Sequence, residues 1–143
     1  AVIPPLEEAL KDPESQVRVN AARSLIPIAY LAGHNRIPFP LDPVLEQLHY
    51  PTASDRNKAV ALLLHLAGNE ENHAAIRDGA SDVLVKIVGA KHPAQREHSL
   101  TLLTMVSGED YGRDPEKWKA WWAAVKKGLP PPKSGPGAPG AGS

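Results

Sequence analysis

The chain has 143 residues, carries 16 Lys and Arg against 16 Asp and Glu, and contains no cysteine. Its length and an apolar content of 42% predict one soluble domain with a buried core, and its zero formal net charge removes the positive field that attracts nucleic acid. The lack of cysteine excludes disulfide frameworks, thiolate zinc sites and thiol nucleophiles. No apolar run is long enough for membrane insertion, so we expect a soluble protein of the cytoplasm or of a bacterial periplasm.

The N-terminal half of the chain predicts two pairs of helices. A short helix is expected over residues 6–11 and a longer one over 17–31, in which Pro27 should produce a kink because proline lacks a backbone donor. A short helix over 43–50 and a longer one over 56–66 form the second pair. The apolar residues of the longer helices recur on one helical face: Val17, Ala21, Leu25 and Ile28, then Ala59, Leu62, Leu63 and Leu66.

The C-terminal half continues the helical pattern as far as residue 129. A short helix is expected over residues 82–88, with Ser81 or Asp82 as its N-cap, and a longer one over 96–108. Residues 130–143 are rich in Pro and Gly and carry no large apolar side chain, which is typical of a disordered tail. The sequence therefore predicts a folded domain over 1–129 and a tail over 130–143.

The most informative pattern is an internal repeat. Residues 56–68 align without gaps on residues 96–108, and the segment that begins at Arg18 aligns on the segment that begins at Arg56. The alignment creates a column of small residues, Ala21, Ala59 and Ser99, and a column of leucines, Leu25, Leu63 and Leu103. A period near 40 residues built from two helices predicts an all-α, short right-handed α-solenoid of about three repeats.

Leu10 to Ala22 resembles the core of a HEAT repeat, including an Asp and an Arg six residues apart, here Asp12 and Arg18. The resemblance implies that this pair forms a hydrogen-bonded ladder between repeats. The later repeats keep the Arg, but Tyr50 and Ala90 stand in the Asp column. Residues 69–79 followed by 82–88 resemble an armadillo repeat with its short extra first helix.

Residues 108–122 resemble the segment that closes many bacterial HEAT-repeat proteins. Asp114 is a good N-cap, and Trp118, Trp121 and Trp122 follow within about a 100° arc of the helix. We expect this helix to cap the last open face of the solenoid, with Trp121 at the edge of the stripe, partly exposed and available as an aromatic contact. The alternative is an aromatic platform for a ligand.

The second helices of the repeats carry polar residues in positions that the packing face does not use. In solenoids of this type these helices line the concave face, so the inferred binding residues are Asn20, Arg23, Lys58, His65, His98 and Thr101. The alternative interpretation is an ordinary solvated helix face.

Motifs for catalysis and metal binding are absent from the sequence. The six His residues contain no pair spaced four apart, and no nucleophile elbow or phosphate loop occurs, so we expect no enzyme, no metal site and no cofactor. The predicted function is a non-catalytic scaffold that binds a protein or peptide. Two alternatives remain open at this point: a nucleic-acid-binding module that resembles certain DNA glycosylases, and a protein that resembles bilin lyases.

Overall fold

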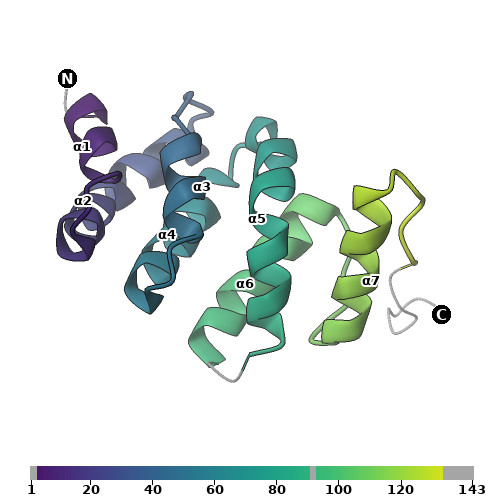
Figure 1. The fold of residues 1–143 in the computed structure, drawn as a ribbon. Helices are drawn as coiled ribbons and strands as arrows, with labels where there is room; N and C mark the ends of the chain where they lie inside the picture. The colour runs from purple at the N-terminus through teal and green to yellow at the C-terminus, as the bar shows by residue number, and fades with distance from the viewer. Residues whose placement is uncertain (1–2, 91–92, 134–143) are drawn as a thin grey trace. The chain divides into compact units, whose positions relative to one another are not determined.

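The structure is a computed structural model that describes residues 3–90 and 93–133. Within these ranges the chain is all-α: it forms seven α-helices and one 3-10 turn, and it contains no strand (Figure 1). The helices are α1 (Ile3–Ala9), α2 (Ser15–His34), α3 (Asp42–Leu48), α4 (Ala53–Leu66), the 3-10 turn η1 (Glu70–Asn72), α5 (His73–Val88), α6 (Pro93–Ser107) and α7 (Pro115–Lys126).

Two compact units make up the chain, Ala1–Ala80 and Ser81–Ser143, and helix α5 runs through the boundary between them. In the N-terminal unit, α1 packs on α2 and α3 packs on α4, while α2 lies along α4. These contacts are those of two successive helical hairpins, in which each second helix packs on the next. The repeated helix pairs expected from the sequence are therefore present, and the fold is that of a short HEAT-like solenoid.

The two columns of the repeat alignment form the core. Leu25, Leu63 and Leu103 are at most 1% exposed. The small residues of the other column are buried as well: Ala21, Ala59 and Ser99. Small side chains at these positions allow neighbouring helices to approach closely, and the leucines fill the space between them. The repeat is thus a packing repeat.

Glycine marks the closest approach of α2 and α4. A Cβ atom on Gly33 would lie 2.0 Å from the carbonyl oxygen of His65, far inside van der Waals contact. Helix α2 reaches this point because it continues through Pro27, which is exposed, and ends at His34 rather than at Leu31. Leu25 and Ala29, on either side of the proline, are buried, so both halves of the helix pack on the core.

Helix α5 corrects one expectation. The sequence predicted a short helix that begins at Asp82 after a cap at Ser81, but α5 is continuous from His73 to Val88. Ser81 is fully buried in the middle of this helix. Gly79, the last residue of the segment 69–79, lies within this helix and allows close packing, since a Cβ there would lie 2.8 Å from a methyl carbon of Leu45. The separate first helix of an armadillo repeat is therefore not formed.

Helix α7 begins as expected, because the Asp114 carboxylate accepts hydrogen bonds from the backbone N–H groups of residues 116 and 117. The prediction of partial exposure for Trp121 was wrong: it is 2% exposed, and Trp118 and Trp122 are also buried. Trp121 packs against both other indoles, with ring centroids 5.7 and 5.8 Å away. Trp121 thus contacts the indole three residues before it and the adjacent one, and it is buried although a helical wheel places it at the edge of the stripe.

The start of the C-terminal tail touches the fold. The hydroxyl of Tyr111 donates a hydrogen bond to the carbonyl of Pro132. Burial raises the pKa of Tyr111, and the charge of Glu109 adds to this effect. The predicted tail therefore contacts the folded domain at Pro132, because a buried hydroxyl needs an acceptor and the tail backbone supplies one. Residues 134–143 of the predicted tail lie outside the described residues.

Candidate functional site: the exposed face of helices α2 and α4

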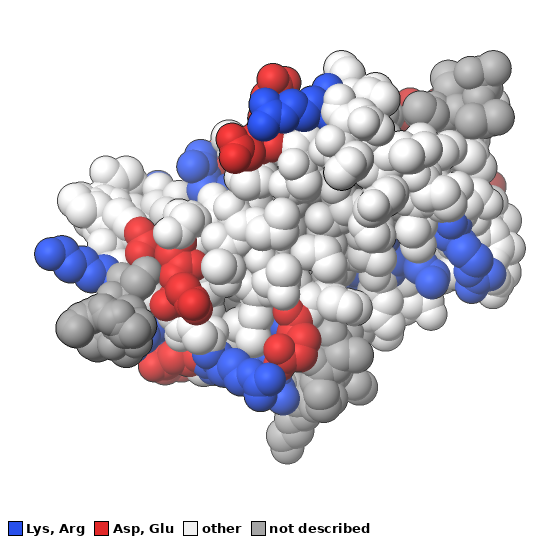
Figure 2. Space-filling model, turned by 180° about the vertical axis from the view of Figure 1, so that it is seen from behind, with Lys and Arg blue, Asp and Glu red and all other residues white. Residues whose placement is uncertain are grey.

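Charged side chains are dispersed on the surface. Figure 2 shows a face on which uncharged residues make up most of the area, and the charged residues stand in small separate groups, some of mixed sign and some of bases alone. A protein that binds along a nucleic acid backbone needs a continuous row of Lys and Arg. This face offers no such row, so smaller features of the helices decide what it can bind.

The feature that stands out in the N-terminal unit is the outward surface of α2 and α4, here called the α2–α4 face. On α2 its residues recur at intervals of three and four, as on one side of a helix, and all are exposed. The α4 residues follow the same spacing and are half-buried. The face consists of Asn20, Arg23, Pro27, Tyr30, Leu31 and His34 of α2, and of Lys58, Ala61 and His65 of α4.

A cluster of rings occupies the C-terminal end of the α2–α4 face. The Tyr30 ring stacks on His34, with centroids 5.9 Å apart, and meets the His65 ring edge-on at 5.7 Å. The second contact joins α2 to α4. Tyr30 and Leu31 each remain 53% exposed. Large apolar side chains held in place by neighbours and left accessible are the usual anchors of a protein interface.

Charge is segregated between the first and second helices of this unit. The ionisable residues of α1 and α3 are all acids: Glu7, Glu8, Asp42 and Glu46. Those of α2 and α4 are all bases except for Asp55 and the Tyr30 phenol: Arg18, Arg23, His34, Arg56, Lys58 and His65. Since Asp55 is fully buried, the second helices present only basic groups to solvent.

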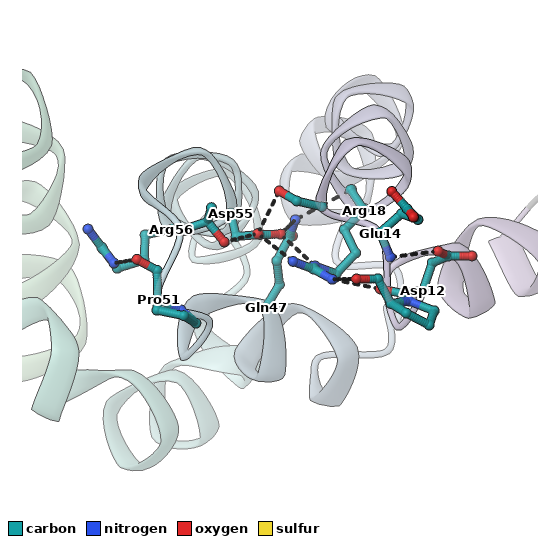
Figure 3. A network of polar contacts seen from close by, with 10 residues as sticks. Asp12, Glu14, Arg18, Gln47, Pro51, Asp55 and Arg56 are labelled. Atoms are coloured by element: carbon teal, nitrogen blue, oxygen red, sulfur yellow. Dashed lines mark hydrogen bonds and ion pairs between the residues drawn. The ribbon is translucent and has the colours of Figure 1, made fainter.

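The charge of Asp55, a buried residue in the first turn of α4, is compensated by the donors around it (Figure 3). Its carboxylate accepts two hydrogen bonds from the Arg18 guanidinium, both 2.9 Å long, and one from the Gln47 amide at 3.1 Å. The hydroxyls of Thr52 and Ser15 donate to it at 2.6 and 3.2 Å. Burial alone would raise the pKa of Asp55, but the hydrogen bonds from Arg18, Thr52 and Gln47 together lower it well below its ordinary value. The carboxylate is ionised and inaccessible, so it links α2 to α4 and contributes no negative charge to the surface of these helices.

The conserved arginine column of the repeats closes the turns within the helix pairs. Arg18 donates to the backbone carbonyls of Asp12 and Pro13, Arg56 to that of Pro51, and Arg96 to that of Ala90. Figure 3 shows the first two of these clamps. The implied side-chain pair of Asp12 and Arg18 is not formed: the Asp12 carboxylate accepts from the backbone N–H of Glu14. The inter-repeat ion pair uses Asp55 of α4 instead, whose carboxylate accepts two parallel hydrogen bonds from the guanidinium.

The predicted binding residues fall on both units. Asn20 and Arg23 are exposed on α2, and a 3.5 Å hydrogen bond joins them. Lys58 and His65 are half-buried on α4. The four belong to the α2–α4 face. In the C-terminal unit, His98 and Thr101 are exposed on α6, and the Thr101 hydroxyl bonds the Glu97 carbonyl of its own helix.

Thr101 also lines an open groove of about 370 Å³ in the C-terminal unit, here called the α6 groove. Its walls are the exposed side of α6 and the loop before α7: Glu97, Leu100, Thr101, Thr104, Met105, Asp110, Gly112 and Arg113. An exposed ion pair between Arg113 and Glu97 spans two of these residues. The α6 groove is a second accessible surface made by a second helix of the repeat.

Sequence reasoning missed the ring cluster of Tyr30 and His34 and the neighbouring Leu31. They were overlooked because the repeat alignment ended near residue 31 and compared only columns present in all repeats. The spacing Arg23, Pro27, Tyr30, His34 would have found them, since it follows one side of α2.

The described part of the chain contains neither a cluster of metal ligands nor a membrane-spanning helix. No three His, Asp or Glu side chains there gather closely enough to hold a metal ion. None of the helices described is both long enough and apolar enough to cross a membrane.

The model of the HEAT repeat family matches residues 2–31, which include α1 and most of α2. The match falls on the first of the helix pairs that the structure repeats. The chain is a HEAT-like helical-repeat protein. Stacked helical repeats form extended surfaces that can bind a partner. Comparison of this HEAT-like chain with the curated proteins and with the solved structures gives no significant match to either.

Proposed function

We propose that this HEAT-like protein is a non-catalytic module that binds a protein or peptide on its α2–α4 face. The observation that carries the proposal is the cluster around Tyr30, which is 53% exposed although its ring is fixed between two imidazoles. An ordinary solvated helix face presents flexible polar side chains. A preorganised aromatic ring loses little conformational entropy on binding and can bury a large apolar area.

The absence of catalysis in this proposal rests on the state of Asp55. It is the carboxylate whose pKa is moved furthest by its surroundings, and in other proteins such a group is a candidate acid or base. Here four side chains occupy its oxygens and the residue is fully buried. It has no path to a substrate, which supports a structural role.

The nucleic-acid alternative has less support. On the face in Figure 2, acids stand among the bases, and α1 and α3 add four carboxylates to the N-terminal unit. Such charges repel phosphate, and a few cations give weak binding at physiological salt. For the bilin-lyase alternative, the sequence offers neither a cysteine nor a nucleophile motif as a catalyst. Both alternatives predict measurable effects that differ from those of a peptide scaffold.

A selection of random peptides displayed on phage tests the proposal. We expect peptides to be enriched on the wild-type protein, and their affinity to fall about tenfold in Tyr30→Ala, as for an interface anchor. Thr104→Ala in the α6 groove is the control and should leave their affinity unchanged. Because Tyr30 is half exposed, its substitution should also leave the melting temperature nearly unchanged.

The proposal fails if no peptide is enriched, or if the enriched peptides bind Tyr30→Ala as well as they bind the wild type. Enriched peptides that lose affinity in Thr104→Ala instead would move the binding site to the α6 groove.

A further inference from the structure

We propose that the partner of the α2–α4 face is an acidic peptide segment with an apolar or aromatic anchor. This inference rests on the proposed function and adds the chemical class of the ligand. It follows from two properties of the face that occur together: cations without a carboxylate partner, and accessible apolar side chains beside them.

The cations are Arg23 and Lys58. Among the described residues neither forms an ion pair, and Arg23 reaches only the side-chain oxygen of Asn20. The two stand three columns apart in the repeat alignment, on α2 and α4, which pack along each other. Since the sole carboxylate of these helices is buried against Arg18, the face has no acid of its own to compensate them. Carboxylates from a partner would supply the missing counter-charge.

The apolar part of the ligand has a defined place. Tyr30 and Leu31 lie about two turns beyond Arg23 on the same side of α2, and Ile37 in the following loop is 50% exposed. The backbone N–H of Ile37 bonds the Ala32 carbonyl at 2.8 Å, which holds this loop against the end of α2. A peptide that lies along α2 can therefore pair its acids with Arg23 and Lys58 and bury an aromatic or aliphatic residue against Tyr30 and Leu31.

Charge segregation selects the sign of the partner. A basic segment would be attracted to the acids of α1 and α3, whereas an acidic one is steered to the bases of α2 and α4. A nucleic acid shares the negative sign. A nucleic acid would contact only two Lys or Arg cations on the face, and its charged phosphate backbone would gain nothing from contact with the exposed apolar side chains of Leu31 and Ile37.

Three fluorescein-labelled peptides measured by anisotropy test the inference. The first places Asp and Glu on both sides of a Trp-Leu pair, the second replaces its acids by Lys, and the third replaces Trp-Leu by Ala-Ala. We expect the first to bind, and each of the other two to bind at least about tenfold more weakly. The double variant Arg23→Glu with Lys58→Glu should weaken the first peptide about tenfold and reduce the salt dependence of its binding. Lys86→Glu with Lys117→Glu changes the net charge equally in the C-terminal unit and should have little effect.

The inference is overturned if the Lys peptide binds as tightly as the acidic one, or if both double variants weaken binding equally. Tighter binding of single-stranded oligo-dT than of the acidic peptide would assign the face to nucleic acid. The proposed function is judged separately: phage-selected peptides that depend on Tyr30 but show no excess of Asp and Glu would leave it standing and refute this inference.

Discussion

Replacement of Asp55 by Asn removes one charge from the most constrained polar site of the protein and changes its shape very little. The carboxylate accepts five hydrogen bonds, two of them from Arg18, and its side chain is 0% exposed. An amide can accept through one oxygen only, and its NH₂ group would face the donors of Arg18. Loss of one member of a buried ion pair costs about 3–5 kcal/mol, since the other charge stays buried without compensation. A domain of this size is stable by about 5–15 kcal/mol, so the variant should remain folded but markedly weakened.

Urea unfolding at neutral and at acidic pH measures this effect and its origin. The pKa of Asp55 is near 3.8 in the unfolded chain and far lower in the folded protein. Below about pH 4, therefore, the unfolded state binds a proton at Asp55 and the folded state does not. The stabilisation by the carboxylate is complete above that pH and is lost as the pH falls further. We expect the wild type and Asp55→Asn to differ by about 3–5 kcal/mol at neutral pH and to converge in acid.

A difference below about 1 kcal/mol at neutral pH, or one that does not shrink in acid, would refute this account of the Arg18–Asp55 pair. The double variant Arg18→Met with Asp55→Leu is the control. Removal of both charges should recover much of the lost free energy, as it does for other buried pairs.

Gly33→Ala should lower the free energy of unfolding by about 1–3 kcal/mol or more, because its Cβ would lie 2.0 Å from the His65 carbonyl oxygen. The control Gly89→Ala makes only ordinary van der Waals contacts and should be nearly neutral in the same urea titration. Trp121→Ala should cost about 3–5 kcal/mol, which contradicts a role as an exposed platform, and a cost below about 1 kcal/mol would restore that role. Tyr111→Phe should cost about 1 kcal/mol through loss of the bond to the tail carbonyl; thermal melts of this variant that match the wild type would show that the contact contributes nothing.

Helical periodicity and the repeat columns were readable from the sequence, because they depend on local spacing. Apolar residues three and four apart must share one side of a helix whatever packs on it, so the core columns of Leu25, Leu63 and Leu103 are buried as predicted. The cap of α7 by Asp114 was readable for the same reason: a helix terminus and its capping side chain are neighbours in the chain.

Contacts between helices decided the rest. Whether Gly79 ends a helix or admits Leu45, and whether Trp121 is exposed, depends on what packs opposite each residue. The partner of Arg18 could not be read from the sequence either, because Asp12 is near in the chain but Asp55 has the geometry for two parallel hydrogen bonds. The same holds for the α2–α4 face. The sequence predicted most of its polar residues. The contact of Tyr30 with His65 and the buried pair of Arg18 with Asp55 exist only in the folded chain, because each joins residues more than 30 positions apart.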